Sequence, residues 1–453
     1  MKKLLASILA ITLSIGLMAG CGAPTATPSA PAPEVSTAPA PAAPAPVAPA
    51  AEPVELSISW WGGDARHEAT QKGIDAFSKK YPNITVKTNY AAWTGWEDVM
   101  STALYAGTAQ DVNQVNWNWL FNYDEGSKGK TFVDLNTMSD YIDLTQFDKN
   151  ALAQCTIDGR LTAIPVSMTG RIFYWNDATF KKAGLSVPKT YDELIAAGEV
   201  FKTKLGDDYY PMVMGEYDRM IFMVWALECK YGKDWVVDGK LNYTQAEIEE
   251  GFQMFLDMEK AHVIPTIKTL AGDGAESLDK NPKWMEGKYA GIFEWDSSAT
   301  KFQKAQSEGQ SMIVGDYLTG FGPNKGGFTK VSLAFAISES AKNKPEAAQL
   351  IDFLLNDEEG IKILNSQRGI PLSKKALKIC SDEKLLEPLV TEANIKVMEW
   401  CGNKLDPTFE DAKLKALNTG VYYDAMAGLS YGDYSKAEAA KVLIDGIGGV
   451  LKG

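Results

Sequence analysis

Histidine is almost absent from this chain. Its two histidines, His67 and His262, stand far apart, and no H-E-x-x-H pair occurs among its 453 residues. Zinc sites draw most of their ligands from His and Cys, so this scarcity argues against the common zinc-site patterns. We expect no metal site and no cofactor.

Cysteine is also sparse. Four cysteines follow Cys21, and none of them forms a C-x-x-C pair. They are too few for a disulfide-stapled scaffold. Buried free thiols are the default expectation for Cys155, Cys229, Cys380 and Cys401, with a Cys380–Cys401 bridge as the alternative.

The chain lacks an excess of positive charge and, after Cys21, any long apolar run. Its net charge is −13, and the first 20 residues carry only two lysines, so their removal takes −13 to about −15. Such a balance disfavours nucleic acid and anionic membrane surfaces as partners. No later stretch approaches the ~20 apolar residues of a transmembrane helix.

The first 53 residues are typical of an exported and anchored protein. Two lysines followed by an apolar run predict a signal peptide over residues 1–20. The small residues before Cys21 resemble the bacterial lipobox, although Met18 stands where that pattern usually has Leu. This predicts a lipidated Cys21, with ordinary signal cleavage as the alternative. Residues 21–53 are rich in Pro and Ala, which predicts an extended spacer without a core.

The stretch SWWGGDARH, residues 59–67, joins a strand pattern to a helix pattern. Residues 54–58 alternate between apolar and polar side chains, whereas Ile74, Phe77 and Tyr81 recur at helical spacing. In open α/β sheets, ligands bind at such turns beyond the carboxyl ends of strands. We therefore expect a ligand site at this turn.

A sugar suits the residues of this turn. Trp61 can cover the C–H face of a sugar ring, while Asp64 and Arg66 can meet its hydroxyls. The alternatives are that Trp60 is a core residue and that Asp64 caps the helix.

The same alternation of elements continues along the chain. Strand patterns over residues 84–87 and 111–116, with a helix pattern over 99–104 between them, predict a mostly parallel sheet. Six of the 12 tryptophans gather at these strand ends, and we expect about half of them to form a binding rim. The six are Trp60, Trp61, Trp93, Trp96, Trp117 and Trp119. The candidate contacts from this group, beyond Trp61, are Trp93, Trp117, Trp119 and the intervening Asn118.

Several segments, taken together in their order, resemble the bacterial extracellular solute-binding proteins that serve ABC importers, in their carbohydrate-binding, maltodextrin-binding-like branch. Within them, Asp158-Gly159 predicts a hairpin, and Thr190 with Glu193 has the spacing of a helix capping box. The segments are YAGTAQDV (105–112), DGRLTAIP (158–165), IFYWNDATFKKAGL (172–185), VPKTYDEL (187–194), MEGKYAGIFEWD (285–296), KNKPEAAQLIDFLLNDEEG (342–360) and SQRGIPLSKKAL (366–377).

The resemblance implies an α/β, two-lobed periplasmic-binding-protein-like fold, with hinge strands and a ligand cleft between the lobes. The first lobe would comprise residues 54–165 and 320–370. The second lobe would comprise residues 166–319 and 371–453.

The resemblance also nominates residues at the cleft. The family's sugar-contacting aromatic corresponds to Trp295, with Asp296 beside it, and the Gly-x-Pro turn nominates Arg368. Arg368 could instead pair with a carboxylate. Glu216, Tyr217 and Trp225 resemble cleft positions more loosely, and a Trp in a sequence such as that around Trp225 is more often a helix-core residue than a ligand contact.

Together with the lipobox-like segment before Cys21, the resemblance implies a lipid-anchored protein on the extracellular face, or the periplasmic side, of the cytoplasmic membrane. It would capture an oligosaccharide, close around it as a monomer, and deliver it to an ABC permease without catalysis. Two alternatives stay open: a carbohydrate-active enzyme, which would need two carboxylates at a defined separation, and a surface sugar sensor or adhesin with the same cleft.

Overall fold

The computed structural model describes residues 52–124, 130–275 and 277–451. The predicted signal peptide, Cys21 and nearly all of the spacer lie outside these residues. Within the described ranges, no helix has both the length and the apolar character needed to cross a bilayer.

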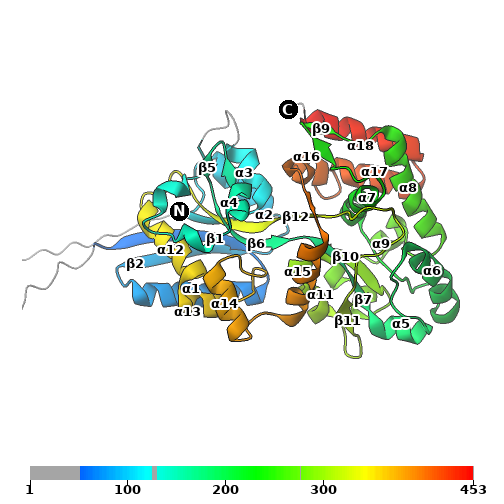
Figure 1. Cartoon of the computed structure of the whole chain (residues 1–453), viewed down its shortest axis with the longest axis horizontal. Helices are drawn as coiled ribbons and strands as arrows, with labels where there is room; N and C mark the ends of the chain where they lie inside the picture. The colour runs from blue at the N-terminus through cyan, green and yellow to red at the C-terminus, as the bar shows by residue number, and fades with distance from the viewer. Residues whose placement is uncertain (1–51, 125–129, 276, 452–453) are drawn as a thin grey trace, which may run out of the picture. The chain divides into compact units, whose positions relative to one another are not determined.

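The first lobe is built around a six-stranded mixed sheet with strand order β13-β12-β3-β1-β2, in which β13 spans Asn403–Lys404; the sixth strand, β6, pairs with β12 off this path (Figure 1). The strands β1 (Val54–Trp61), β2 (Ile84–Ala91) and β3 (Val112–Val115) run parallel, as the alternating pattern predicts. β12 (Phe328–Ile337) runs antiparallel to β3 and to β6 (Ile164–Thr169). The carboxyl ends of β1, β2 and β3 therefore share one edge of the sheet.

Helices cover the two faces of this sheet (Figure 1). Because α1 follows β1 directly, its first turn lies at the carboxyl edge of the sheet. The helices of this lobe are α1 (Asp64–Lys80), α2 (Trp96–Tyr105), α3 (Trp117–Asp124), α4 (Lys149–Gln154), α12 (Lys344–Asn356), α13 (Glu358–Leu364) and α14 (Lys374–Asp382). The Asp158-Gly159 hairpin forms as predicted, between β4 (Thr156–Ile157) and β5 (Arg160–Leu161).

The second lobe surrounds a small antiparallel sheet of β10 (Gly291–Trp295), β7 (Arg171–Asn176) and β11 (Met312–Val314). The predicted capping box is present, since Thr190 and Glu193 bond to each other's backbone. The helices of this lobe are α5 (Asp177–Ala183), α6 (Tyr191–Leu205), α7 (Glu216–Tyr231), α8 (Gln245–Lys260), α9 (Ile267–Gly272), α10 (Pro282–Met285), α11 (Ala299–Ala305), α15 (Pro388–Trp400), α16 (Ala412–Lys415), α17 (Val421–Tyr431) and α18 (Lys436–Leu451). Its short strands are β8 (Val236–Val237), β9 (Lys240–Leu241) and β13 (Asn403–Lys404), the last of which pairs with β12.

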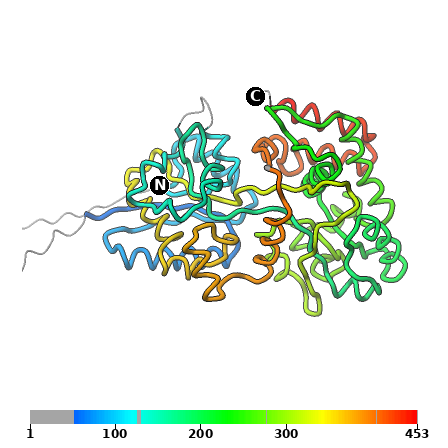
Figure 2. Tube along the Cα trace, viewed as in Figure 1, coloured from blue at the N-terminus to red at the C-terminus, as the bar shows by residue number. Residues whose placement is uncertain are grey.

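The buried apolar side chains fall into two large clusters, one for each lobe. The first draws on residues 56–166 and 331–364, and the second on residues 172–328 and 390–447. Full burial of one large apolar side chain contributes roughly 1.5–3 kcal/mol, so each cluster can stabilise its own lobe. The chain passes between the clusters three times (Figure 2).

Two of these passages lie later in the chain than the sequence analysis expected. The return to the first lobe falls at residues 328–331 rather than near 320, because β12 completes the first sheet. The last passage follows α14 rather than residue 370, because Ala376 and Cys380 of α14 pack against Ile361 of α13.

The alternative of a Cys380–Cys401 bridge is wrong. Both residues are free thiols; Cys380 packs against α13, whereas Cys401 packs against the second cluster. Cys155 and Cys229 are buried free thiols, as the sequence analysis expected.

Candidate functional site

Three tryptophan rings meet at the carboxyl edge of the first sheet. Trp61 ends β1, Trp93 lies in the loop after β2, and Trp119 lies in α3. The ring centroid of Trp61 is 5.1 Å from that of Trp93 and 5.6 Å from that of Trp119. Trp93 is 40 % exposed and Trp61 is partly buried, whereas Trp119 is 1 % exposed and donates from Nε1 to Glu97 at 2.8 Å. Trp61 and Trp93 therefore have surface that a ligand can reach, and the buried ring of Trp119 packs against theirs.

The other early tryptophans belong to the first core. Trp60 is fully buried and stacks on Tyr90, and Trp96 is also buried. Trp117, a predicted contact, is only 5 % exposed because it opens α3 against the core and donates to the Gln154 carbonyl at 3.0 Å. Trp117 is therefore a core residue and offers little surface to a ligand.

The first turn of α1 places Asp64 and Arg66 beside Trp61. Gly63 is the N-cap residue, so Asp64 does not cap the helix; it is the first helical residue and is exposed. Arg66 donates from Nε to the Gln367 carbonyl at 2.9 Å and from Nη1 to the Trp61 carbonyl at 3.2 Å. Burial lowers the pKa of Arg66 to about 10, and the group therefore stays charged at neutral pH.

Arg368 lies behind this turn rather than at its surface. It is 3 % exposed and donates to the side chains of Gln114 at 2.9 Å and Thr70 at 2.8 Å. The alternative that it pairs with a carboxylate fails among the described residues, where no ion pair of Arg368 occurs. Burial, together with the neighbouring charge of Arg66, lowers its pKa. Arg368 therefore acts as a support for the loop that holds Arg66.

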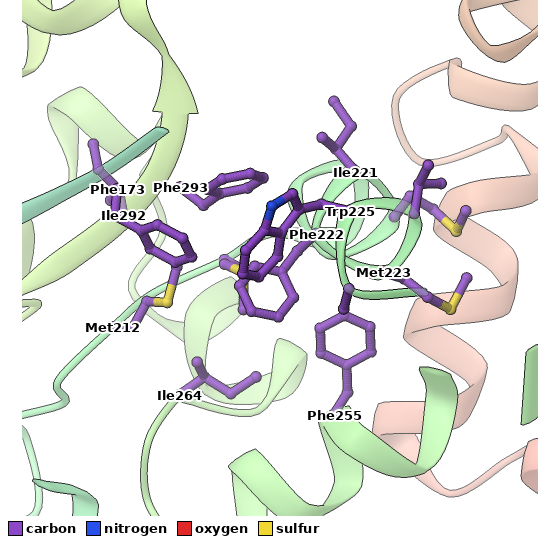
Figure 3. Close-up of a cluster of buried hydrophobic side chains, with 14 of the residues drawn as sticks. Phe173, Met212, Ile221, Phe222, Met223, Trp225, Phe255, Ile264, Ile292 and Phe293 are labelled. Atoms are coloured by element: carbon purple, nitrogen blue, oxygen red, sulfur yellow. The ribbon is translucent and has the colours of Figure 1, made fainter. Parts of the chain in front are cut away.

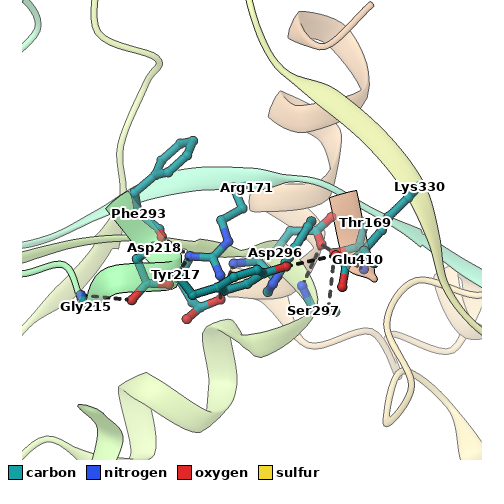
Figure 4. Close-up of polar contacts among 12 residues, drawn as sticks. Thr169, Arg171, Gly215, Tyr217, Asp218, Phe293, Asp296, Ser297, Lys330 and Glu410 are labelled. Atoms are coloured by element: carbon teal, nitrogen blue, oxygen red, sulfur yellow. Dashed lines mark hydrogen bonds and ion pairs between the residues drawn. The ribbon is translucent and has the colours of Figure 1, made fainter. Parts of the chain in front are cut away.

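Trp295 ends β10 in the second lobe and is partly buried. Two cations lie over its ring: Arg171 Cζ at 4.9 Å and Lys330 Nζ at 4.7 Å from the ring centroid. Arg171 is held by Asp218 at 2.6 Å (Figure 4). Both cations lie within cation–π distance of the ring, so the predicted aromatic shelf borders two positive charges.

Asp296 is buried and already bonded. Its carboxylate accepts hydrogen bonds from Thr169 of β6, from Asn394 at 2.6 Å and from the Ser297 N–H at 2.6 Å (Figure 4). Burial raises its pKa to about 6 despite these bonds. Because these bonds tie β6 to the second lobe, Asp296 joins the lobes and is not available to a ligand.

Tyr217 belongs to a cluster of charges around Glu410. The carboxylate of Glu410 accepts from the Tyr217 hydroxyl at 2.9 Å, from Lys330 at 2.7 Å and from Lys415 at 3.1 Å. Burial alone would raise the pKa of Glu410, but the attraction of the two lysines outweighs it and holds this pKa well below its usual range.

This cluster also reaches the first lobe. The carboxylate of Glu97 lies 3.4 Å from Lys415, whose Nζ is 5.8 Å from the Trp93 ring centroid. Asn118, which is fully buried, donates to the Glu410 carbonyl at 2.9 Å. Asn118 and Lys415 therefore link the two lobes beside the exposed tryptophan.

Trp225 is a core residue, and its interpretation as a ligand contact does not fit its burial. It is fully buried in α7, and its ring centroid lies 5.3 Å from that of Phe173 and 5.6 Å from that of Phe293 (Figure 3). Glu216 opens the same helix and is partly buried, and this burial raises the pKa of its carboxyl. Glu216 stays a candidate contact, whereas Trp225 does not.

Sequence reasoning missed six charged residues of this site: Glu97, Arg171, Asp218, Lys330, Glu410 and Lys415. The sequence did indicate a special role for Arg171, because this charged residue begins a strand that is largely apolar and fully buried. No local pattern could indicate Lys330 or Glu410, because the two pair across 80 positions of the chain, and Lys415 meets Glu97 only in the complete fold.

The chain belongs to the bacterial extracellular solute-binding proteins, whose family pattern it matches over residues 63–361. Its fold is that of a two-lobed periplasmic binding protein, which confirms the fold and family expected from the sequence.

Two solved structures are similar over nearly the whole folded part. One is a periplasmic oligogalacturonide-binding protein from Yersinia enterocolitica, in complex with saturated digalacturonic acid. It is 35 % identical, with a TM-score of 0.83, and the match covers 88 % of this chain and 99 % of that chain. The other is a periplasmic solute-binding protein from Pectobacterium atrosepticum, 33 % identical, with the same coverage and TM-score. An uncharacterized ABC transporter extracellular-binding protein of Pyrococcus horikoshii is 24 % identical over 285 residues, which are 60 % of this chain and 58 % of that protein.

Proposed function

We propose that this protein captures an oligosaccharide outside the cell and delivers it to an ABC import permease. The observation that carries the proposal is the set of aromatic faces on both lobes: two residues that end strands, Trp61 and Trp295, with Trp93 in a loop and Tyr217 in the first turn of α7. Trp61 and Trp93 keep accessible surface on the first lobe, and Trp295 and Tyr217 are partly buried on the second. Flat aromatic faces suit the C–H faces of sugar rings.

The cluster around Glu410 supports a site between the lobes. Lys415 contacts Glu410 on its own lobe and Glu97 on the other, next to Trp93. A ligand that touches both lobes stabilises the form in which they close on it. The relative from Yersinia enterocolitica, whose structure contains a sugar, supports the same class of ligand.

Lipidation of Cys21 would hold the protein on the extracellular face of the membrane through its spacer. Two or more acyl chains give stable anchoring where a single chain does not. Working as a monomer, the protein would then meet its permease at the same surface.

Calorimetry of the full chain, purified in mild detergent, against a panel of neutral and acidic oligosaccharides tests the proposal. We expect at least one oligosaccharide to bind, and to bind more tightly than its monomer, because more rings are covered. X-ray scattering should then show a smaller radius of gyration at saturation. A panel without any binding member would refute sugar capture, and release of reducing ends would indicate an enzyme.

A further inference from the structure

Arg66 is a cation without a carboxylate partner among the described residues. Two of its donors are used by backbone carbonyls, those of Trp61 and Gln367, and Nη2 donates to no described residue. Asp64, in the same helical turn, is exposed and forms no ion pair with it. Buried or half-buried charges are normally paired, so Arg66 lacks the anion that most such residues have.

The chain is built to hold Arg66 in this position. A Cβ on Gly62 would lie only 2.6 Å from Arg66 Cδ and 3.0 Å from its Cβ, so the absence of a side chain at Gly62 makes room for the arginine stem. The two backbone acceptors then fix the guanidinium plane beside Trp61. A guanidinium group that is already held in one orientation loses less side-chain entropy when it binds a ligand, which favours a role for Arg66 in ligand binding.

Arg368 adds a second positive charge behind the first. It is buried, its Nη1 has no hydrogen-bond partner, and no described carboxylate pairs with it. The remaining cations of the site are compensated, since Arg171 pairs with Asp218, and Lys330 and Lys415 share Glu410. The uncompensated charge of the site is therefore concentrated at Arg66 and Arg368.

The start of α1 points to the same conclusion. This helix has 17 residues; among the described residues no side chain caps its N-terminus, and Gly63 leaves open space there. The free N–H groups of this turn lie on the edge that carries Trp61, and the exposed carboxylate of Asp64 in the same turn offsets part of the helix dipole.

We propose that the sugar is anionic: a uronic acid residue stacks on Trp61, and Arg66 receives its carboxylate. This inference rests on the proposed function and names the class of its ligand. The planar guanidinium matches a carboxylate with paired donors, and charge-assisted bonds of this kind are roughly twice as strong as neutral ones. Arg368 does not touch the ligand; it holds the loop that carries Gln367 and adds its charge to the field.

The test compares digalacturonic acid with its dimethyl ester and with neutral galactobiose, by calorimetry on the full chain. We expect the acid to bind at least about 30-fold more tightly than either neutral form, with an affinity that falls as salt is raised. Arg66→Gln should reduce this preference at least about tenfold, and Arg66→Lys should reduce it less. Lys72→Gln is the matched control, because it removes the same charge from an exposed site on the same helix and should keep the preference.

The outcomes separate this inference from the proposed function. If the ester binds within threefold of the acid, or if only neutral members of a wider panel of uronic and neutral oligosaccharides bind, the inference is overturned and sugar capture stands. If Arg66→Gln keeps the same preference as Lys72→Gln, the carboxylate lies elsewhere and the assignment to Arg66 is overturned. If no member of the wider panel binds, both proposals fall.

Discussion

Glu410→Gln should destabilise the protein strongly. The carboxylate is 3 % exposed and accepts from two lysine side chains that are themselves only 7 % and 10 % exposed. The substitution keeps the size of the side chain but leaves Lys330 with no ion pair among the described residues, and Lys415 with Glu97 alone, at 3.4 Å. Removal of one partner from a buried ion pair costs about 3–5 kcal/mol, and we expect a loss of free energy of unfolding in that range.

The assay is urea unfolding followed by tryptophan fluorescence at pH 7. Glu399→Gln is the matched control, because the same chemical change at this exposed position should alter stability by no more than about 0.5 kcal/mol. The pKa of Glu410 is lowered by folding, so its contribution is present above its unfolded pKa and is lost only as pH falls through the lower folded value. The difference between wild type and Glu410→Gln should therefore persist at pH 5. A loss below about 1 kcal/mol would refute the claim that this carboxylate neutralises the two lysines.

Three further predictions concern binding, anchoring and pH. Trp61→Ala and Trp295→Ala should each weaken oligosaccharide binding by roughly 30- to 1,000-fold in calorimetry, and a folded variant within threefold of wild type would show that its ring does not stack on the sugar. Cys21→Ser should move the protein from the membrane fraction to the soluble fraction, and a variant that still sediments with membranes without detergent would contradict lipidation. Burial raises the pKa of Glu228 to about 7, although the hydrogen bond from the Gly327 N–H at 2.7 Å opposes this shift. The protonated carboxyl therefore contributes to the free energy of unfolding below the unfolded pKa of Glu228, and this contribution is lost as pH rises through 7. Glu228→Gln should therefore reduce the loss of stability between pH 5.5 and pH 8 by about 2 kcal/mol, measured by urea unfolding, and an unchanged pH dependence would show that another group titrates.

The local patterns predicted the elements of the first lobe. Alternation over residues 54–58 predicted β1, and the helical spacing of Ile74 and Phe77 predicted α1. The turn between them lies where expected. Strand and helix geometry repeat side chains every 2 and every 3.6 residues, so the spacing of apolar residues indicates each element directly.

The roles of single tryptophans were harder to predict. Trp60 and Trp61 are neighbours on a strand, so they face opposite sides, but the sequence does not say which side is the core. Trp117 was expected at a strand end and instead begins a helix, which buries it. The cluster around Glu410 depends on residues brought together only by the complete fold, so no local pattern could report it.

The three passages between the lobes have a mechanical consequence. β6 leads into β7 through Gly170 alone, and β6 pairs with β12 along its length, so two of the passages lie side by side as one ribbon. A Cβ on Gly170 would lie 2.5 Å from Val397 and 2.9 Å from the Phe328 carbonyl, which leaves no room for a bulkier joint. The proposed closure on a ligand would therefore bend both strands at the same place, and a single pair of distance labels, one on each lobe, would report it.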